Sequence, residues 1–311
     1  MAWLLPIAML AALVVDRIFG EPPARWHPVV GMGWFLGLFS KRLLTLAPAA
    51  AFSAGALIWC VGAINVGLLA AVLETSLIYA FKPWEGWLGL AGCALLLGLL
   101  LKPLLAWRML SDEVGAVEAA LAESLPAGRA RLARLVSRDT ANLSAAEVRE
   151  AAIETLSENL NDSVVAPLFW FMLAGLPGAA IYRFANTADA MWGYRGEWEW
   201  AGKWAARADD LLSWLPARIT GLALLGFNFK RWPALVQQAR HTPSPNSGWP
   251  MAAMALILNT RLAKPGVYVL NEAGAEVAPG DLARAQGLAL RALLICAAPL
   301  AGGAAALRGL L

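Results

Sequence analysis

Carboxylate and amide side chains are concentrated in one stretch of the chain, residues 147–162. At 100° per residue, five of them fall on one narrow helix face: Glu147, Glu150, Glu154, Glu158 and Asn161. Oxygen ligands of this kind suit a hard cation such as Mg²⁺. We therefore take Glu154, Glu158, Asp162 and the later Asp189 as candidate metal ligands. The alternative is that this ridge is an ordinary solvated helix face.

Arginines accompany these acidic residues. Arg138, Arg207 and Arg218 supply positive charge of the kind that binds phosphate groups. Asp209 and Asp210 are candidate catalytic acids, although adjacent helix positions point about 100° apart, so only one of them faces a site. Simple ion pairing with the neighbouring arginines is the alternative. Further polar side chains that could orient a substrate or ATP are Asp139, Asn159, Asn186, Thr187, Ser244 and Asn246.

Histidine occurs only twice, at His27 and His241, each in a loop rich in proline or glycine. Imidazole titrates near neutral pH and is the usual general base. Both are candidate bases, with His241 preferred, and a structural role is the alternative. The sequence contains no Gly-x-x-x-x-Gly-Lys-Ser/Thr, Gly-x-Gly-x-x-Gly or Gly-x-Ser-x-Gly motif, so any ATP must bind in another way.

Long apolar segments must position these groups. Of 311 residues, 59% are hydrophobic and only 15% charged, whereas soluble domains carry about 25% charged residues. A bilayer core of about 30 Å needs roughly 20 helical residues. Four stretches are predicted to span: 2–15, within 43–73, 86–107 and 292–307. The sequence thus predicts an all-α, polytopic membrane protein, with residues 1–311 as one membrane-embedded domain and a retained N-terminal span.

A fifth apolar stretch, 163–182, is uncharged but interrupted by proline and glycine. If it crossed the membrane simply, the polar segments 138–162 and 186–218 would lie on opposite sides and could not share a site. We therefore predict a re-entrant or buried broken helix here. The ionisable Glu74 and Lys102 lie at span ends, where snorkelling to the interface would explain them.

Lysine and arginine placement sets the expected orientation. Four cations, Arg17, Arg25, Lys41 and Arg42, follow the first span, and only Lys82 lies between the second and third. By the positive-inside rule the first loop faces the cytoplasm, as does the catalytic region 108–290. This region is expected to be helical, with a capping box at Ser144 and Glu147 and one short hairpin within 266–277.

The net charge excludes a nucleic-acid-binding protein, and the cysteines have a simple structural interpretation. A net charge of +3 without a basic stripe is not a nucleic-acid footprint. The three cysteines lie far apart in apolar segments and are interpreted as small buried hydrophobes.

Taken together, the polar blocks resemble the adenosylcobinamide-phosphate synthase family (cobinamide synthase, CobD/CbiB) of cobalamin biosynthesis. The first block is Asp16-x-x-x-Gly20-Glu21-Pro22 with His27-Pro28-Val29-x-x-x-Gly33. Six blocks in order carry the likeness, which covers most of the chain. The others are Arg138-Asp139-Thr140, the run from Glu154 to Phe169, Asn186-Thr187-x-Asp189-x-Met191-x-Gly193-Tyr194, Gly202-x-x-x-Ala206-Arg207-x-Asp209-Asp210 with Pro216-Ala217-Arg218, and Ser244-Pro245-Asn246-x-Gly248-Trp249.

The resemblance implies an enzyme that joins aminopropanol phosphate, or free aminopropanol, to a propionate carboxylate of adenosylcobyric acid. Since a carboxylate and an amine form a salt at neutral pH, activation by ATP and Mg²⁺ through an acyl phosphate is expected. The expected setting is the bacterial inner membrane, with the site facing the cytoplasm and other membrane-associated enzymes of the pathway as possible partners. Four positions depart from the family pattern: Glu21, Ser137, Ala190 and Ser213.

Two other functions are compatible with the sequence. A small-solute transporter would place ionisable residues within its spans, whereas here the polar groups lie in the loops. A non-catalytic membrane paralogue, acting as scaffold or sensor, would tolerate the four departures.

Overall fold

The computed structural model describes residues 2–84 and 86–310, the last four by backbone alone. These residues are almost entirely helical, which confirms the predicted all-α class. They form two compact units. The first unit comprises residues 1–106, 166–213 and 297–311, and the second comprises 107–165 and 214–296.

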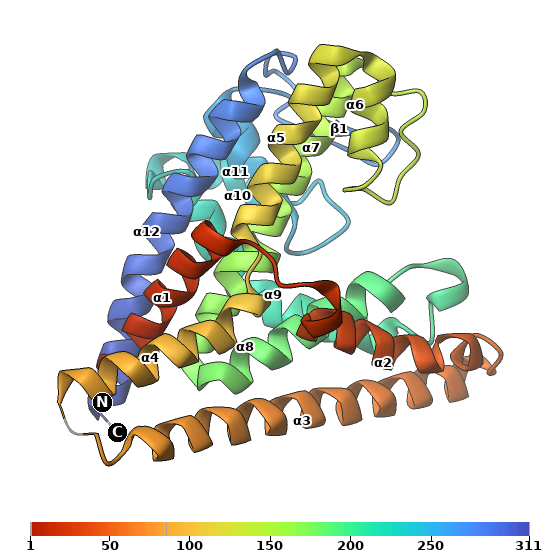
Figure 1. Cartoon of the computed structure of the whole chain (residues 1–311). Helices are drawn as coiled ribbons and strands as arrows, with labels where there is room; N and C mark the ends of the chain where they lie inside the picture. The colour runs from red at the N-terminus through yellow and green to blue at the C-terminus, as the bar shows by residue number, and fades with distance from the viewer. Residues whose placement is uncertain (1, 85, 311) are drawn as a thin grey trace. The chain divides into compact units, whose positions relative to one another are not determined.

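The first unit is built from helices α1 (Leu4–Phe19), α2 (Pro28–Leu43), α3 (Pro48–Phe81), α4 (Trp87–Leu101) and α8 (Ala166–Trp192). It also contains the start of α9 (Lys203–Leu224) and the end of α12 (Asp281–Leu310). Helix α1 packs against α4, and the long α3 packs along α8 (Figure 1). Single 3₁₀ turns at Ala24–Trp26, Lys102–Leu104 and Gly196–Trp198 connect the helices.

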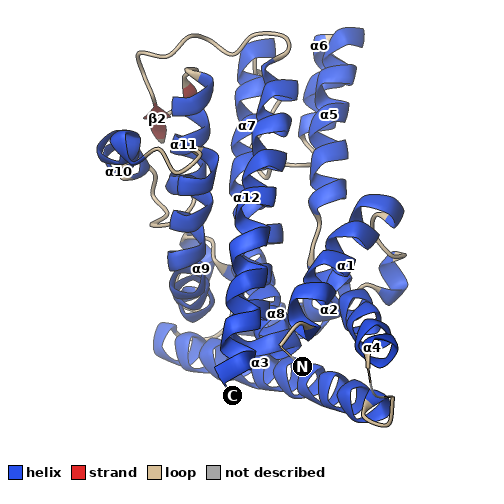
Figure 2. Ribbon diagram, turned by 90° about the vertical axis from the view of Figure 1, so that its left-hand side faces the viewer, coloured by secondary structure: helices blue, strands red, loops and turns tan. Residues whose placement is uncertain are grey.

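The second unit contains α5 (Trp107–Glu123), α6 (Leu125–Leu132), α7 (Ala145–Leu160), α10 (Trp232–Ala239) and α11 (Gly248–Leu258). A π-helical turn at Asn161–Val165 follows α7, and a 3₁₀ turn at Phe229–Arg231 precedes α10. Helices α5, α6 and α7 pack side by side (Figure 2). The expected hairpin exists but begins earlier than predicted, with β1 (Leu262–Lys264) antiparallel to β2 (Tyr268–Leu270).

Four helical segments are long and apolar enough to cross a membrane: Pro48–Phe81, Trp87–Glu123, Ala145–Trp192 and Asp281–Ala306. Helix α3 shows the inside-out packing of a lipid-facing helix. Glycine and alanine residues such as Gly62 and Gly67 face α8, where an added Cβ would meet Phe184 and Ile181. Large side chains such as Leu57 and Leu68 are more than 60% exposed. Small residues let helix backbones approach closely in lipid, so this is a multi-pass membrane protein.

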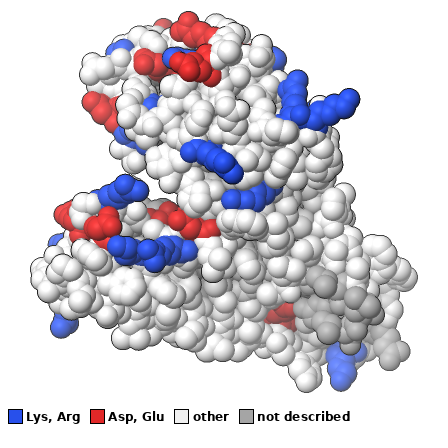
Figure 3. Space-filling model, turned by 180° about the vertical axis from the view of Figure 1, so that it is seen from behind, with Lys and Arg blue, Asp and Glu red and all other residues white. Residues whose placement is uncertain are grey.

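Length and composition alone select one segment that differs from the predicted spans. Helix α1 has only 16 residues, fewer than the roughly 20 that cross a bilayer core. The segment 145–192 is instead among the four that qualify by length and composition. Most of the face drawn in Figure 3 is uncharged, and its charged side chains gather in a few patches.

Helix α8 is broken and largely buried, as the sequence predicts for 163–182. Ala174 and Gly175 have non-helical backbone angles, and Gly175 has φ +65°. The Glu74 carboxylate accepts a 2.6 Å hydrogen bond from the Leu176 amide, at the start of the second half of the helix. A carboxylate at a helix N-terminus satisfies free amides and the helix dipole. Glu74 and Lys102 are buried, 7% and 4% exposed, so the snorkelling interpretation is wrong.

Replacing Gly175 with alanine is expected to destabilise the protein by at least about 2 kcal/mol, since a positive φ is unfavourable for a residue with a Cβ. The new methyl group would also press against the Glu74 carboxylate. Thermal unfolding in detergent measures the effect. Gly37→Ala is the matched control, because nothing lies within 4 Å of its added Cβ. Equal melting temperatures for Gly175→Ala and wild type would contradict the capped break.

Candidate functional site

A polar pocket of about 180 Å³ lies in the second unit. We call it the Arg138 pocket. Helix α7 supplies one wall, the loop before α7 a second, and the β1–β2 hairpin a third. Its polar lining consists of Ser137, Arg138, Glu154, Thr155, Glu158, Asn159, Lys264 and Tyr268. The structure therefore brings together four of the residues selected from the sequence: Arg138, Glu154, Glu158 and Asn159.

Arg138 and Glu154 form the ion pair at the base of this pocket. The Arg138 Nη2 atom donates to Glu154 Oε2 at 2.7 Å. Glu154 is only 5% exposed. Arg138 Nη1 and Glu154 Oε1 are also buried, and neither has a hydrogen-bond partner of standard geometry in the described chain. Buried polar atoms are normally satisfied, so the unmatched Arg138 Nη1 donor indicates room for a polar ligand, whereas the Glu154 carboxylate also interacts with the Tyr268 hydroxyl.

Lys264 and Tyr268 line the same pocket but were not selected from the sequence. They lie on β1 and β2, more than 100 residues after α7. Burial, together with the negative charge of Glu154, raises the pKa of the Tyr268 phenol, which therefore remains protonated and able to donate. The only sequence signal was the hairpin itself, which does not indicate which polar segment it contacts.

Helix α7 is buried on both faces, so the solvated-face interpretation of its acidic ridge is wrong. Ser144 and Glu147 form the predicted capping box. Glu150 is 1% exposed and accepts a 2.9 Å hydrogen bond from the Ala263 amide of β1. Arg261 lies 3.7 Å from its other oxygen. Glu150 therefore attaches the hairpin to α7 and helps to shape the pocket.

Other selected residues near α7 make local hydrogen bonds. The Asp139 Oδ1 atom accepts from the Ala141 amide at 2.9 Å and forms a turn. Asn159 donates to the Thr155 carbonyl at 3.0 Å. Asp162 accepts from Asn161 at 2.8 Å within the π-helical turn.

A second polar cluster joins α9 to the loop before α11. The Arg218 guanidinium lies over two indole rings, 4.1 Å from the Trp214 centroid and 4.6 Å from that of Trp249. It donates to the side-chain oxygen of Asn246 at 3.2 Å. Ser244 accepts from the amides of Asn246 and Ser247, which holds this loop in place.

The two histidines have different hydrogen bonds. His27 Nδ1 accepts from the Val29 amide, and His27 Nε2 lies 3.0 Å from Glu21, so both ring nitrogens are engaged. His241 Nδ1 lies 3.1 Å from the Val269 carbonyl. A carbonyl only accepts, so Nδ1 carries the proton and Nε2 of a neutral His241 is an acceptor. Of the two, His241 has the arrangement of a general base.

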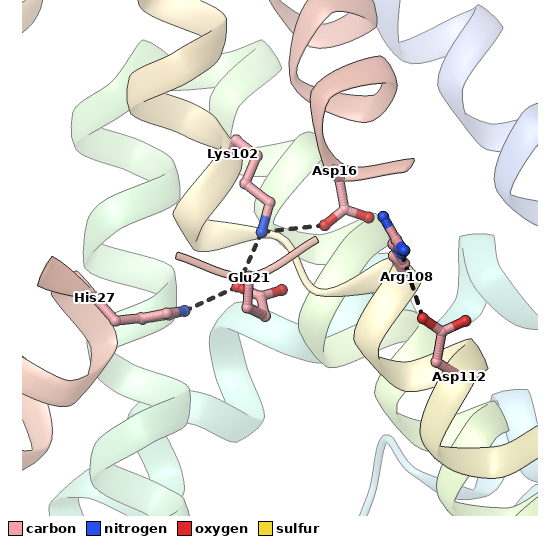
Figure 4. Close-up of polar contacts among 6 residues, drawn as sticks. All are labelled: Asp16, Glu21, His27, Lys102, Arg108 and Asp112. Carbon is pink, nitrogen blue, oxygen red and sulfur yellow. Dashed lines mark hydrogen bonds and ion pairs between the residues drawn. The ribbon is translucent and has the colours of Figure 1, made fainter. Parts of the chain in front are cut away.

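Figure 4 shows the ion cluster around His27 in the first unit. Lys102 Nζ lies 3.3 Å from Asp16 and 2.9 Å from Glu21. Burial alone would raise the pKa of Glu21, but the hydrogen bonds from His27 and Lys102 outweigh it and hold this pKa below its usual value. The same view includes the i,i+4 pair of Arg108 and Asp112, 3.3 Å apart. The opening motif thus joins α1, α2 and the end of α4.

The remaining selected residues also lie in the first unit. Asn186 accepts from the buried Arg183 at 3.1 Å, and Thr187 donates to the Arg183 carbonyl at 2.6 Å. Asp189 lies against Gly193 at the end of α8. On α9, Asp209 is buried, and burial raises the pKa of Asp210.

Arg207 is exposed and lines a small pocket of about 160 Å³ with Arg195 and Lys203. All the residues that line this pocket belong to the first unit.

The carboxylates of the described residues determine which kind of metal site the protein could form. Within residues 2–84 and 86–310, no group of three or more His, Cys, Asp or Glu residues could hold an ion unaided. Mg²⁺ that accompanies a nucleotide needs only one or two carboxylates, because the phosphates and water complete its shell. Glu154 and Glu158, beside Arg138 and Lys264, fit a ligand that carries both a cation and phosphate.

Comparisons with known proteins agree on one family. A family model described as "CobD/Cbib protein" matches residues 9–292. The chain is 40% identical over 281 residues to a "Probable cobalamin biosynthesis protein CobD" of Methanothermobacter thermautotrophicus, covering 85% of this chain and 86% of that protein. It is also 40% identical over 272 residues to the "Cobalamin biosynthesis protein CobD" of Chromobacterium violaceum, covering 84% and 81%. No solved structure matches significantly.

Proposed function

Because this chain belongs to the CobD/Cbib protein family of cobalamin biosynthesis, we propose that it is an ATP-dependent amide ligase. In this proposal it joins aminopropanol phosphate, or aminopropanol, to a propionate carboxylate of adenosylcobyric acid. The observation that carries the proposal is the Arg138 pocket, in which a half-buried cation and carboxylates from the family-like blocks meet. Such a pocket suits a reaction between anionic groups.

The chemistry requires activation of the carboxylate. Its oxygen attacks the γ-phosphorus of ATP, ADP leaves, and an acyl phosphate forms. The amine nitrogen then attacks the acyl carbon, phosphate leaves, and a base takes the amine proton. Positive charge at the transferring phosphoryl group lowers the barrier because charge develops there. Mg²⁺, when bound, supplies further charge neutralisation.

Particular side chains fit these tasks. Arg138 and Lys264 would bind phosphate oxygens, and Glu154 and Glu158 would hold the Mg²⁺. Tyr268, protonated and partly buried, would donate a hydrogen bond to a bound anion. His241 is the proposed base, since its Nε2 is an acceptor and imidazole titrates near neutral pH.

For the residues of the first unit, we keep the roles expected from the sequence. Asn186, Thr187 and Arg207 are proposed to bind substrate or ATP, Asp189 to be a metal ligand, and Asp209 or Asp210 to act in catalysis. His27 is the exception, because both of its ring nitrogens already have partners. We propose that His27 positions α2 instead.

The proposed location is the bacterial inner membrane, with the catalytic region 108–290 facing the cytoplasm. The excess of lysine and arginine in the first loop supports this orientation. ATP and both substrates would then be available on one side. Other membrane-associated enzymes of the pathway are proposed partners.

A turnover assay tests this function. Detergent-purified protein is incubated with adenosylcobyric acid, aminopropanol phosphate, Mg²⁺ and ATP, and mass spectrometry follows the corrinoid. We expect an amide product that requires ATP, and parallel reactions with aminopropanol identify the preferred amine. Folded protein that binds the corrinoid but forms no product with either amine would contradict the ligase proposal and favour a non-catalytic paralogue.

A further inference from the structure

A second cavity in the second unit has a different character from the Arg138 pocket. Its volume is about 820 Å³, near the upper end of the roughly 300–1,000 Å³ typical of ligand sites. It lies between α9 and α10 and is bounded by the loop before α11. Its lining includes three indole rings, of Trp214, Trp232 and Trp249, and two arginines, Arg218 and Arg240.

The indole rings surround a positive charge. Arg218 stacks on Trp214 and Trp249, and Trp249 in turn lies 5.2 Å from Trp232, centroid to centroid. The hydrogen-bond partners of Arg218 are neutral oxygens, those of Trp214, Pro245 and Asn246. A half-buried guanidinium that is oriented by neutral groups and faces a cavity is suited to a carboxylate ligand.

From this arrangement we propose that the cavity between α9 and α10 binds the corrin ring of the substrate, with Arg218 pairing with its free carboxylate before that carboxylate is activated. The inference rests on the proposed function, which supplies the corrinoid as substrate. A corrin is a large ring with a conjugated core, so it offers apolar surface that packs against indoles. Its free carboxylate offers a negative charge, which is not found among the hydrogen-bond partners of Arg218 in the described part of the chain.

A hydrogen bond also connects α9, which lines the cavity, to the end of α7, which lines the Arg138 pocket. Two residues after Arg218, the Thr220 hydroxyl donates to Asn161 Oδ1 at 3.1 Å. Asn161 begins the π-helical turn three residues after Glu158, a residue of the Arg138 pocket. The wall of the larger cavity and the end of α7 are therefore held together by a direct hydrogen bond.

Equilibrium dialysis tests the proposal, with adenosylcobyric acid quantified by its visible absorbance. Trp249→Leu should weaken its binding by about 10-fold or more, because a stacking surface is lost. Arg218→Met should weaken binding by a similar factor, about 10-fold. The same variant should bind adenosylcobinamide, which lacks the carboxylate, within about 3-fold of wild type. Trp84→Leu and Lys230→Met, both at exposed positions, are the matched controls.

A variant at the rim of the cavity shows whether weaker binding could instead be caused by misfolding. Pro243 lies in an exposed part of the loop and lines the cavity, so Pro243→Glu adds repulsive charge without disturbing the core. We expect it to weaken adenosylcobyric acid binding as well. Wild-type binding by Trp249→Leu and Pro243→Glu, in preparations whose wild type forms the amide, would overturn the cavity assignment and leave the ligase function intact. Absence of product from wild type would instead remove the proposed function.

Discussion

Glu158→Gln is expected to lower kcat/KM for amide formation by about 100-fold or more, the loss typical when a ligand or charge-stabilising group is removed. Glu158 lines the Arg138 pocket one turn after Glu154 and is only partly buried. Glutamine keeps the shape of the side chain and removes the negative charge. The melting temperature should therefore stay near that of wild type, whereas Mg²⁺-dependent turnover falls.

A substitution of the neighbouring Glu154 should affect stability as well as activity, unlike Glu158→Gln. Glu154→Gln weakens the buried ion pair with Arg138, so it should lower both activity and stability. Glu276→Gln is the matched control, because Glu276 is exposed in the same unit. Turnover by Glu158→Gln equal to that of the Glu276 control would show that the Arg138 pocket is not the reaction site.

The sequence could predict the contents of the Arg138 pocket because most of them come from one helix and the loop before it. The capping box fixes the start of α7, and the helical period then places Glu154 and Glu158 one turn apart. What periodicity could not show was burial. Glu150 and Glu154 form a polar stripe that is typical of a solvated face, and only their pairing with Ala263 and Arg138 reveals that the stripe is covered.

Lys264 and Tyr268 could not be predicted as site residues for a related reason. They reach the pocket through a hairpin that is anchored on α7 by Glu150, a contact between residues 113 positions apart. Local patterns predict an element, but they carry no information on which distant element it contacts. The same reasoning applies to Glu74, whose partner at Leu176 lies 102 residues away.

Predictions that depend on composition, such as the positions of apolar helices, agree with the structure. Predictions of side-chain direction, which depends on packing, were wrong. Apolar length identified α3 and α4 as spans, and proline and glycine correctly marked the break in α8. Snorkelling was expected for Glu74 and Lys102 because both lie near span ends. The structure instead directs both side chains inward, where one caps a helix half and the other joins two carboxylates.

Lys102→Met is expected to destabilise the folded protein by about 3–5 kcal/mol, the usual cost of leaving a buried charge without its partner. Methionine preserves much of the apolar stem of lysine but removes the charge between Asp16 and Glu21. Asp16 is fully buried, so water cannot replace the lost cation. Thermal unfolding in detergent measures the change, and Lys82→Met, at an exposed position of the same unit, is the matched control.

The pH dependence of the stability lost in Lys102→Met shows whether Lys102 stabilises the protein through its charge or through packing. In wild type the pKa of Glu21 lies below its usual value. Its contribution to stability is therefore present above the unfolded pKa of about 4.3 and is lost as pH falls through the lower folded value. Without Lys102, burial favours the protonated form of Glu21 more strongly, so the folded variant takes up a proton at a higher pH than wild type and loses less stability as pH falls. The gap between Lys102→Met and wild type should therefore narrow from pH 7 toward about pH 4. A gap of constant size would mean that the ammonium contributes through packing and not through its charge.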